Sequence, residues 1–252
     1  MGSSLTSRLR KKKSYSPLAG RVALITGASQ GIGLAIAEAL AREGCNLILT
    51  ARNQAKLDQA AKRLKVHRTR ILTVACDVRE PAQVEALMNQ VRRNFRRLDI
   101  LINNAGISHA NLEVSKLPLE TWQEVIETNL TGTFLVTQFA LPLMKSGAAI
   151  VNNLSVAAKR VFTGASAYNA SKHGALGLTD TLREELRPRG IRVIALLAGA
   201  ADTAIWDTLW PEAPRKKMMP AETVAEAVVN ALALPANSTL EELTLRPSAG
   251  TL

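Results

Sequence analysis

The chain has 252 residues, of which 47% are hydrophobic, and this is enough to bury a substantial core in a single domain. No apolar run reaches the roughly 18 residues that a membrane-spanning helix needs, which predicts a soluble, cytoplasmic protein. The formal net charge is +11, but no aromatic side chain except Phe95 interleaves the basic clusters, so nucleic-acid binding is not expected.

Residues 1–17 differ in composition from the rest of the chain. They contain five basic residues and no acid, and we expect a disordered tail ahead of the domain at residues 18–252. The opening letters MGSSLT fit an N-myristoylation pattern, and the basic run after them would add a second membrane signal. An organelle transit peptide and a plain flexible tail are the alternatives.

From Arg21 onward, short apolar strands alternate with helical patterns. The predicted strands are residues 22–26, 46–50, 71–75, 100–103, 149–154, 191–196 and 242–245. The predicted helices are residues 31–43, 53–64, 81–95, 119–145, 166–187 and 222–233. This alternation is typical of an α/β, Rossmann-type doubly wound parallel sheet of about seven strands with helices on both faces. Ligands bind at the edge where the carboxyl ends of such strands meet.

One long irregular connection interrupts this order. Residues 199–220 carry Trp206, Trp210, Met218 and Met219, an apolar content that is unusual for a solvated loop. We predict a flap that covers a substrate, because long loops in compact domains often act as lids. A loop packed on the surface or in a subunit contact is the alternative.

Neither the cysteines nor the basic clusters indicate a further site. Cys45 and Cys76 lie in apolar runs without neighbours at ligand spacing, so we expect buried, reduced thiols and no metal. Basic residues gather at residues 62–70 and 92–97, near the ends of predicted helices, where they complement the helix dipole.

A glycine-rich turn follows the first predicted strand and opens the first helix. Glycine permits a tight turn and a close approach of the backbone to a phosphate, which the amide groups of a helix N-terminus attract. The turn predicts a dinucleotide site formed by Gly27, Ser29, Gln30, Gly31, Ile32 and Gly33.

The end of the second strand indicates which dinucleotide binds. An NAD-binding chain usually offers a carboxylate to the ribose hydroxyls here, whereas this chain reads Thr50-Ala51-Arg52-Asn53. The Arg52 guanidinium suits a 2′-phosphate in charge and in its planar fork of donors. We therefore predict NADP(H) as the cofactor; the alternative is that Arg52 is a surface residue beside a helix.

Tyr168 and Lys172 lie four residues apart on a predicted helix and so share one face. A positive charge within roughly 4–6 Å of a phenol favours the phenolate and lowers its pKa. Tyr168 could then protonate the alkoxide that forms when a carbonyl accepts hydride.

Together, these motifs resemble the short-chain dehydrogenase/reductase family. The glycine turn, Asn103-Asn104-Ala105-Gly106 after the fourth strand, Ser155 after the fifth, and Tyr168 with Lys172 occur in the family's order and spacing. The resemblance runs from about Leu18 to the C-terminus.

The resemblance implies roles for individual residues. Tyr168 matches the general acid/base, Lys172 the residue that lowers its pKa and binds the nicotinamide ribose, and Ser155 the hydroxyl that orients the carbonyl. Asn129 matches an asparagine that holds a water in a proton relay. Further cofactor contacts are implied at Asp77, Val78, Asn104, Ala105, Gly106, Gly199 and Thr203.

Two positions depart from the family pattern. Ala198-Gly199 stands where Pro-Gly is usual, so the loop beside the nicotinamide lacks a fixed φ angle. Asn153-Leu154 replaces the usual Ile-Ser before the serine, and an inward Asn153 would need buried partners. Both changes bear on cofactor orientation and the substrate pocket more than on proton transfer.

The resemblance implies an NADP(H)-dependent carbonyl reductase or alcohol dehydrogenase that acts on a small molecule. A 3-oxoacyl-[acyl-carrier-protein] reductase is one alternative, because a basic surface could attract an acidic carrier. A cofactor-binding regulator without useful catalysis is another. The family also implies a homotetramer or homodimer built through the predicted helices at residues 119–145 and 166–187.

Overall fold

The computed structural model of the chain describes residues 16–235 and 237–250. The predicted N-terminal tail therefore lies almost entirely outside the described residues. So does the N-myristoylation pattern at its start.

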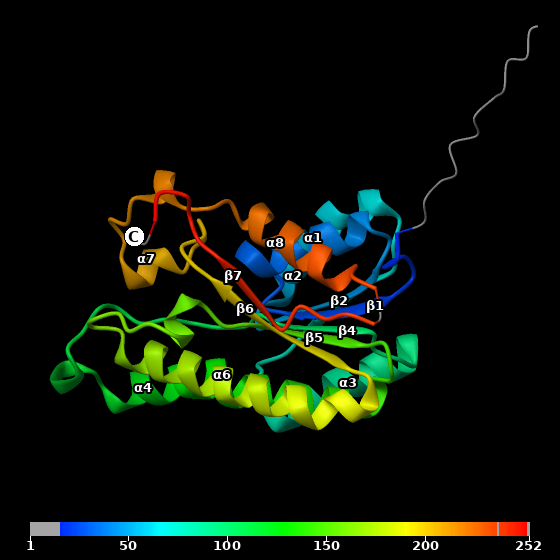
Figure 1. The fold of residues 1–252 in the computed structure, drawn as a ribbon, viewed down its shortest axis with the longest axis horizontal. Coiled ribbons are helices and arrows are strands. Elements are labelled where there is room, and N and C mark those ends of the chain that lie inside the picture. Colours follow the sequence, from blue (N-terminus) through cyan, green and yellow to red (C-terminus); the bar gives the residue numbers. More distant parts are fainter. Residues whose placement is uncertain (1–15, 236, 251–252) are drawn as a thin grey trace, which may run out of the picture.

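A parallel sheet of seven strands forms the centre of the molecule (Figure 1). The strands are β1 (Val22–Thr26), β2 (Asn46–Ala51), β3 (Ile71–Ala75), β4 (Ile100–Asn103), β5 (Ala149–Asn153), β6 (Arg192–Ala198) and β7 (Glu242–Leu245). Their order in the sheet is β3-β2-β1-β4-β5-β6-β7, and every neighbouring pair is parallel. The order reverses between β1 and β4, which is where a doubly wound sheet opens a crevice for a ligand.

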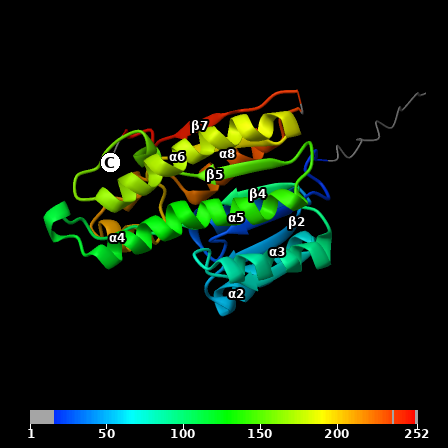
Figure 2. The same cartoon turned by 90° about the horizontal axis from the view of Figure 1, so that it is seen from below.

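Helices cover both faces of the sheet. They are α1 (Gly31–Arg42), α2 (Gln54–Leu64), α3 (Pro81–Phe95), α4 (Leu119–Ile126), α5 (Gly132–Ala140), α6 (Ser166–Leu186), α7 (Trp206–Leu209) and α8 (Ala221–Leu232). Helices α1, α2 and α8 lie on one face, and α3, α5 and α6 lie on the other (Figures 1 and 2). This arrangement is the predicted Rossmann-type fold.

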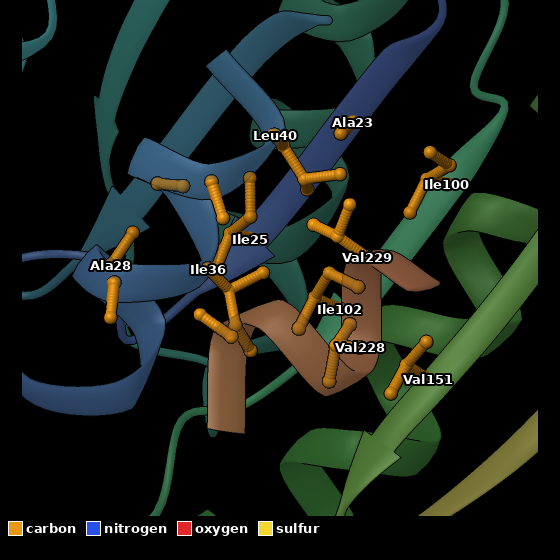
Figure 3. Packing of buried hydrophobic residues seen from close by; sticks show 14 of the residues in the cluster. Ala23, Ile25, Ala28, Ile36, Leu40, Ile100, Ile102, Val151, Val228 and Val229 are labelled. Carbon is orange, nitrogen blue, oxygen red and sulfur yellow. The ribbon is translucent and has the colours of Figure 1, made fainter. Parts of the chain in front are cut away.

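The two faces of the sheet carry separate apolar cores because alternate residues of a strand point to opposite sides. Ile25 of β1 packs with Ile36 of α1 and Val228 of α8 on one face (Figure 3). Leu24, the neighbour of Ile25, belongs to the core on the opposite face, with Val84 of α3. Strands buried on both sides hold their carboxyl ends in fixed positions, and the functional side chains follow those ends.

The long helix predicted at residues 119–145 forms with a continuous helical backbone from residue 119 to 143, but it is not a regular α-helix throughout. Helix α4 gives way to a π-helical turn at Glu127–Thr131, α5 follows, and a 3₁₀ turn at Leu141–Leu143 contains Pro142. A Cβ on Gly132 would lie 2.6 Å from Val78 Cγ2, so the helix passes very close to the segment after β3. The π-helical turn lies at the residue that the resemblance singled out, Asn129.

Candidate active site

A cavity of about 620 Å³ opens at the carboxyl edge of the sheet. Residues at or just after the ends of all seven strands line it, together with the flap, the name we give to residues 199–220. The predicted residues that line it are Gly27, Ser29, Gln30, Gly31, Ile32, Arg52, Asp77, Val78, Asn104, Ala105, Gly106, Ser155, Tyr168, Lys172, Gly199 and Thr203. Only Gly33 and Asn129 of the predicted set do not.

The glycine turn after β1 leaves space where a phosphate could approach the backbone. Gly27 and Gly31 have φ angles of +64° and +57°, which L side chains rarely adopt. Gln30, the N-cap of α1, makes no side-chain capping bond, and the first turn of α1 contains no acid. The helix N-terminus therefore keeps its positive dipole end uncompensated by a side chain, as an anion site requires.

Gly33 lies behind this turn and supports it. A Cβ there would collide with the carbonyl oxygen of Gly27 and the side-chain nitrogen of Asn104. Asn104 Nδ2 donates to the carbonyl oxygens of Thr26, at 2.9 Å, and Gly27, at 3.3 Å. The third glycine of the motif thus admits the asparagine that holds the turn.

The departure at Asn153 has a partner in this same network. Asn153 Nδ2 donates to Asn104 Oδ1 at 2.8 Å, so a side chain at the end of β5 fixes the amide that holds the glycine turn. The carbonyl oxygen of Asn153 accepts a hydrogen bond from Lys172 Nζ at 3.0 Å. Asn153 therefore contacts both the asparagine that holds the glycine turn and the ammonium beside Tyr168.

Ser155, Tyr168 and Lys172 meet at the middle of the cavity. Ser155 follows β5 with φ +131° and ψ 158°, a conformation that costs a non-glycine residue about 1–3 kcal/mol. Its Oγ accepts a hydrogen bond from the Ala157 amide at 3.1 Å, which leaves the hydroxyl hydrogen free to donate elsewhere. Lys172 Nζ lies 5.5 Å from the centroid of the Tyr168 ring.

Burial sets the pKa values of the tyrosine and the lysine. It raises the pKa of Tyr168, and a hydrogen bond with Ser155 acts in the opposite direction. Burial also lowers the pKa of Lys172 to about 8. The net shift of the Tyr168 pKa is therefore upward, because withdrawal from water penalises the phenolate, and the implied lowering of that pKa by Lys172 stays a prediction.

Asn129 lies behind the cavity and bonds to the backbone. Its Oδ1 accepts from the Ile107 amide at 2.8 Å, and its Nδ2 donates to the Ile107 carbonyl oxygen at 2.9 Å and to Ser171 Oγ at 3.0 Å. These bonds tie the π-helical turn to the segment after β4 and to α6. Its implied part in a water relay stays a prediction.

Ion pairs surround the end of the cavity near β2 and β3. The Arg79 guanidinium binds both carboxylate oxygens of Asp77, which lowers the pKa of that carboxyl. Glu124 of α4 lies 3.6 Å from Arg79 and 3.8 Å from Arg52. The Arg52 side chain is 60% exposed, so this last pair is weak and the guanidinium can reach a ligand.

The flap forms the wall of the cavity opposite the ends of the strands. Trp206 and Trp210 line the cavity, and Trp206 Nε1 donates to the Ala201 carbonyl oxygen at 2.8 Å. Arg215 binds Asp202 at 2.6 Å and Asp207 at 3.0 Å. Met218 and Met219 are buried, Met219 in the core beside α8, so only the tryptophans of the predicted apolar set face the cavity.

Sequence reasoning missed residues that line the cavity and one that lies behind it. Thr26 Oγ1 accepts hydrogen bonds from two consecutive amides, those of Asn104 and Ala105, both at 2.9 Å. Arg160 follows the turn after Ser155, and Arg246 follows β7; both line the cavity. The position of Arg246 directly after a predicted strand was the signal that could have found it.

The described residues include two cysteines, and both are free thiols. Cys45 and Cys76 are buried and free, and burial raises their pKa values to about 12 and about 11. Among residues 16–235 and 237–250, no group of His, Cys, Asp and Glu could hold a metal ion. No helix in the same part of the chain is long and apolar enough to cross a membrane.

Known proteins share both the sequence pattern and the fold. The family model described as short chain dehydrogenase matches residues 21–214. An uncharacterized oxidoreductase of Staphylococcus saprophyticus is 34% identical over 234 residues, covering 91% of this chain and 98% of the relative.

Solved structures agree with this relationship. The alcohol dehydrogenase of the archaeon Thermococcus sibiricus, complexed with 5-hydroxy-NADP, superimposes with a TM-score of 0.86 at 31% identity, covering 92% of this chain and 98% of that one. The 3-ketoacyl-(acyl-carrier-protein) reductase of Brucella melitensis, complexed with NADH, gives 0.83 at 29% identity, covering 92% and 98%.

Proposed function

The chain belongs to the short-chain dehydrogenase/reductase family, and from this premise we propose that it transfers hydride between NADP(H) and a carbonyl or secondary alcohol. The observation that carries the proposal is the meeting of Ser155, Tyr168 and Lys172 in one cavity with the glycine turn. A fold alone would not support an activity, whereas a proton donor beside a dinucleotide cradle does.

The residues around the cavity fit a dinucleotide phosphate. Gly27 and Gly31 supply the positive φ angles of the turn, and the N-terminus of α1 faces it. Arg52 supplies a guanidinium at the end of β2 for a 2′-phosphate. When bound, NADP(H) supplies or accepts the hydride.

Side chains of the protein orient the substrate carbonyl and supply the proton. The Ser155 hydroxyl, whose oxygen already accepts the Ala157 amide, donates its hydrogen to the substrate oxygen and orients it. Tyr168 then gives its phenolic proton to that oxygen as negative charge develops there. A raised phenol pKa keeps Tyr168 protonated at neutral pH, which suits a proton donor in the direction of reduction.

Lys172 holds positive charge beside this proton transfer. Its ammonium is anchored to the Asn153 carbonyl oxygen, and the residue as a whole is 6% exposed. With a pKa of about 8, it is mostly charged at pH 7 and loses that charge in mildly alkaline solution. The charge stabilises the phenolate that Tyr168 becomes after it gives up its proton.

Tyr168→Phe tests the proton transfer. The variant keeps the ring and removes the donor, so kcat for a ketone should fall by about 10²–10⁴-fold or more. NADPH affinity, measured by isothermal titration calorimetry, should remain within a few-fold of the wild type. A variant with wild-type kcat would rule out Tyr168 as the proton donor.

Solved structures of this fold contain either an NADP-type or an NAD-type nucleotide, so the fold alone does not select the cofactor. We therefore base the proposal of NADP(H) on Arg52. The wild type should show a higher kcat/KM with NADPH than with NADH, and Arg52→Gln should reduce that ratio by about tenfold or more, the value of a charge-assisted bond. Arg42→Gln, at the far end of α1, removes the same charge elsewhere and serves as the control. A wild-type preference for NADH would refute the NADP assignment.

A 3-oxoacyl-thioester reductase remains the second candidate, since a relative with that name shares the fold. Oxidation of NADPH with ketones, aldehydes and a 3-oxoacyl thioester separates the candidates. Tight NADPH binding without turnover of any of them would favour a regulatory role. We also propose, from the family, a homo-oligomer in solution.

A further inference from the structure

Positive charge gathers at the amino ends of the strands, on the edge of the sheet opposite the cavity. Residues 62–70, which lead into β3, hold five lysine and arginine residues, and residues 92–97, which lead toward β4, hold four. All nine are exposed, and neither segment contains an acid. We call these two segments together the basic patch.

Contacts join the two segments into one surface, although α2 and α3 lie on opposite faces of the sheet. The Arg70 guanidinium lies over the Phe95 ring, 4.6 Å from its centroid, and donates to the Asn94 carbonyl oxygen at 3.2 Å. Arg97 in turn donates to the Gly20 carbonyl oxygen at 3.2 Å. The patch therefore continues from the end of α2, past the end of α3, to the segment that precedes β1.

The helix dipole accounts for only part of this charge. Cations in the last turns of α2 and α3 complement the dipole, as expected from the sequence. The effect of the dipole falls off beyond the last turn, whereas Arg68, Arg70, Arg96 and Arg97 all follow the helical segments. These four arginines need another explanation.

Arg68 and Arg96 also have a backbone conformation that does not favour arginine. Their φ angles are +57° and +63°, and each ends a helical segment. Glycine is the usual residue at such a position because it has no Cβ. In the described ranges, the only other residue besides glycine with a positive φ is Ser155 of the candidate active site. Two arginines where glycine is favoured indicate that their guanidinium groups serve a function.

Few carboxylates of the chain oppose the patch. The described turns at the amino ends of β1 to β4 hold two acids, Glu43 and Asp99, and Asp99 pairs with Arg97 at 3.0 Å. Residues 1–15 contain no acid. The C-terminal carboxylate follows Gly250, which lines the cavity at the other edge, and two residues span at most about 7 Å.

An anionic lipid bilayer fits this surface better than a nucleic acid does. Val66 lies among the cations and is 74% exposed, and the interface of a bilayer can bury such an apolar side chain. Proteins that bind single-stranded nucleic acid stack bases on aromatic rings, whereas the Phe95 ring is covered by Arg70 and packs against the core.

The sequence before the domain adds further positive charge at the same place. Residues 1–15 contain five basic residues, and the described chain begins at Ser16, four residues before the Gly20 that Arg97 contacts. Clusters of lysine and arginine attract the anionic lipids of a membrane surface.

We propose that the basic patch docks the protein on an anionic lipid bilayer, with lipid phosphates bound by its arginines and lysines and Val66 in contact with the interface. The cavity opens at the opposite edge of the sheet, so it faces the aqueous phase. In Figure 1, α7 of the flap lies toward the left of the molecule and α3 toward the right. The inference does not depend on the reaction proposed for the cavity.

Co-sedimentation with vesicles tests the docking. The full chain is mixed with vesicles of phosphatidylcholine alone, or of phosphatidylcholine and phosphatidylglycerol, at about 0.1 M salt, where the Debye length is about 10 Å. We expect binding to the anionic vesicles only, and weaker binding as the salt concentration rises. Equal binding to both kinds of vesicle, or binding to neither, would overturn the proposal.

Arg68→Gly combined with Arg96→Gly should change vesicle binding and stability in different ways. Partitioning onto anionic vesicles should fall by about tenfold or more, because each cation near such a surface contributes about fivefold. The midpoint of chemical denaturation should stay the same or rise, because glycine adopts a positive φ without a Cβ clash. Arg63→Gln combined with Arg93→Gln leaves these two backbone positions unchanged and should weaken binding to a similar extent.

Lys216→Gln combined with Lys217→Gln is the matched control. It removes the same charge from two exposed residues of the flap, at the other edge of the sheet, and should keep vesicle binding within a few-fold of the wild type. Equal losses in all three double variants would show that net charge, and not the basic patch, attracts the vesicles.

Two further measurements decide the partner and the orientation. A DNA duplex that binds the wild type more tightly than the anionic vesicles, at equal phosphate concentration, would assign the patch to a nucleic acid and contradict the proposal. NADPH affinity, measured by calorimetry, should be the same with and without anionic vesicles. A weaker affinity on the vesicles would mean that the cavity faces the bilayer, which contradicts docking through the basic patch.

Discussion

The two walls of the cavity are built in different ways. On the sheet side, which we call the catalytic wall, hydrogen bonds of 3.3 Å or less to backbone or amide groups of other elements hold Asn104, Asn153 and Lys172, and Asn129 behind them. The flap opposite has short internal bonds and the exposed ion pairs of Arg215. The proposed catalytic residues are thus held by the sheet, whereas the flap, which we predict to meet the substrate, is a loop that can vary or move.

The comparison predicts that changes in the catalytic wall cost more than changes in the flap. Gly33→Ala should have the largest effect, because its Cβ would collide with the Gly27 carbonyl oxygen and with Asn104. We expect a loss of about 1–3 kcal/mol or more in the free energy of unfolding, typical of overpacking, and weaker NADPH binding. Chemical denaturation and calorimetry measure the two effects.

Gly177→Ala is the matched control for that substitution. Gly177 is an exposed residue within α6, and a Cβ there would meet nothing within 4 Å. The added methyl group should stabilise the helix by up to about 1 kcal/mol. Equal effects of the two substitutions would show that the glycine turn is not closely packed.

Asn153→Leu should have the next largest effect. It removes the donor to Asn104 Oδ1 and leaves that partly buried oxygen without its partner, at a cost of about 1–3 kcal/mol. NADPH affinity should fall while the pH dependence of kcat stays the same, because the Asn153 carbonyl oxygen still holds Lys172. Asn230→Leu, on the exposed face of α8, is the control. Unchanged NADPH affinity would show that Asn153 does not support the turn.

The lowered pKa of Lys172 makes the free energy of unfolding depend on pH. Its pKa falls from 10.5 to about 8 on folding, so between these values the unfolded state binds more protons than the folded state. The contribution of Lys172 to stability must then rise with pH over that window. Lys172→Met should flatten this rise in the unfolding free energy, and Lys62→Met, on α2, should not. The same slope in Lys172→Met and wild type would contradict the lowered pKa.

The sequence predicted the regular parts of the molecule because they depend on local pattern. All seven strands lie within two residues of their predicted bounds, since each is a short apolar run between turn signals. The π-helical turn within the helix at residues 119–145 escaped prediction because Asn129 bonds there to Ile107 and Ser171, which are distant in the chain.

The residues of the candidate site also fall into two groups, those that the local sequence predicted and those that it did not. Residues in motifs, such as Tyr168 and the glycine turn, were predicted because a spacing identified them. The partner of Asn153 and the place of Arg246 were not, because each depends on which strands are neighbours in the sheet. The direction of the Tyr168 pKa shift was also missed, since it depends on burial rather than on the distance to Lys172.

The flap should be the most tolerant part of the cavity. Arg215→Gln removes both ion pairs to Asp202 and Asp207, yet all three side chains are at least one-third exposed. Exposed pairs contribute about 0–1 kcal/mol, so the midpoint of chemical denaturation should change little. The KM for the carbonyl substrate should change more than the NADPH affinity, because Trp206 and Trp210 belong to the same loop as Arg215.

Amide hydrogen exchange compares the local stability of the flap with that of the catalytic wall. In Arg215→Gln, amides of residues 201–219 should exchange faster while those of β5 and α6 keep their wild-type rates, because local opening of a loop does not require unfolding of the sheet. Faster exchange in β5 as well would mean that the flap and the catalytic wall open as one unit. In that case, the different hydrogen bonding of the flap and the catalytic wall would not give them different local stabilities.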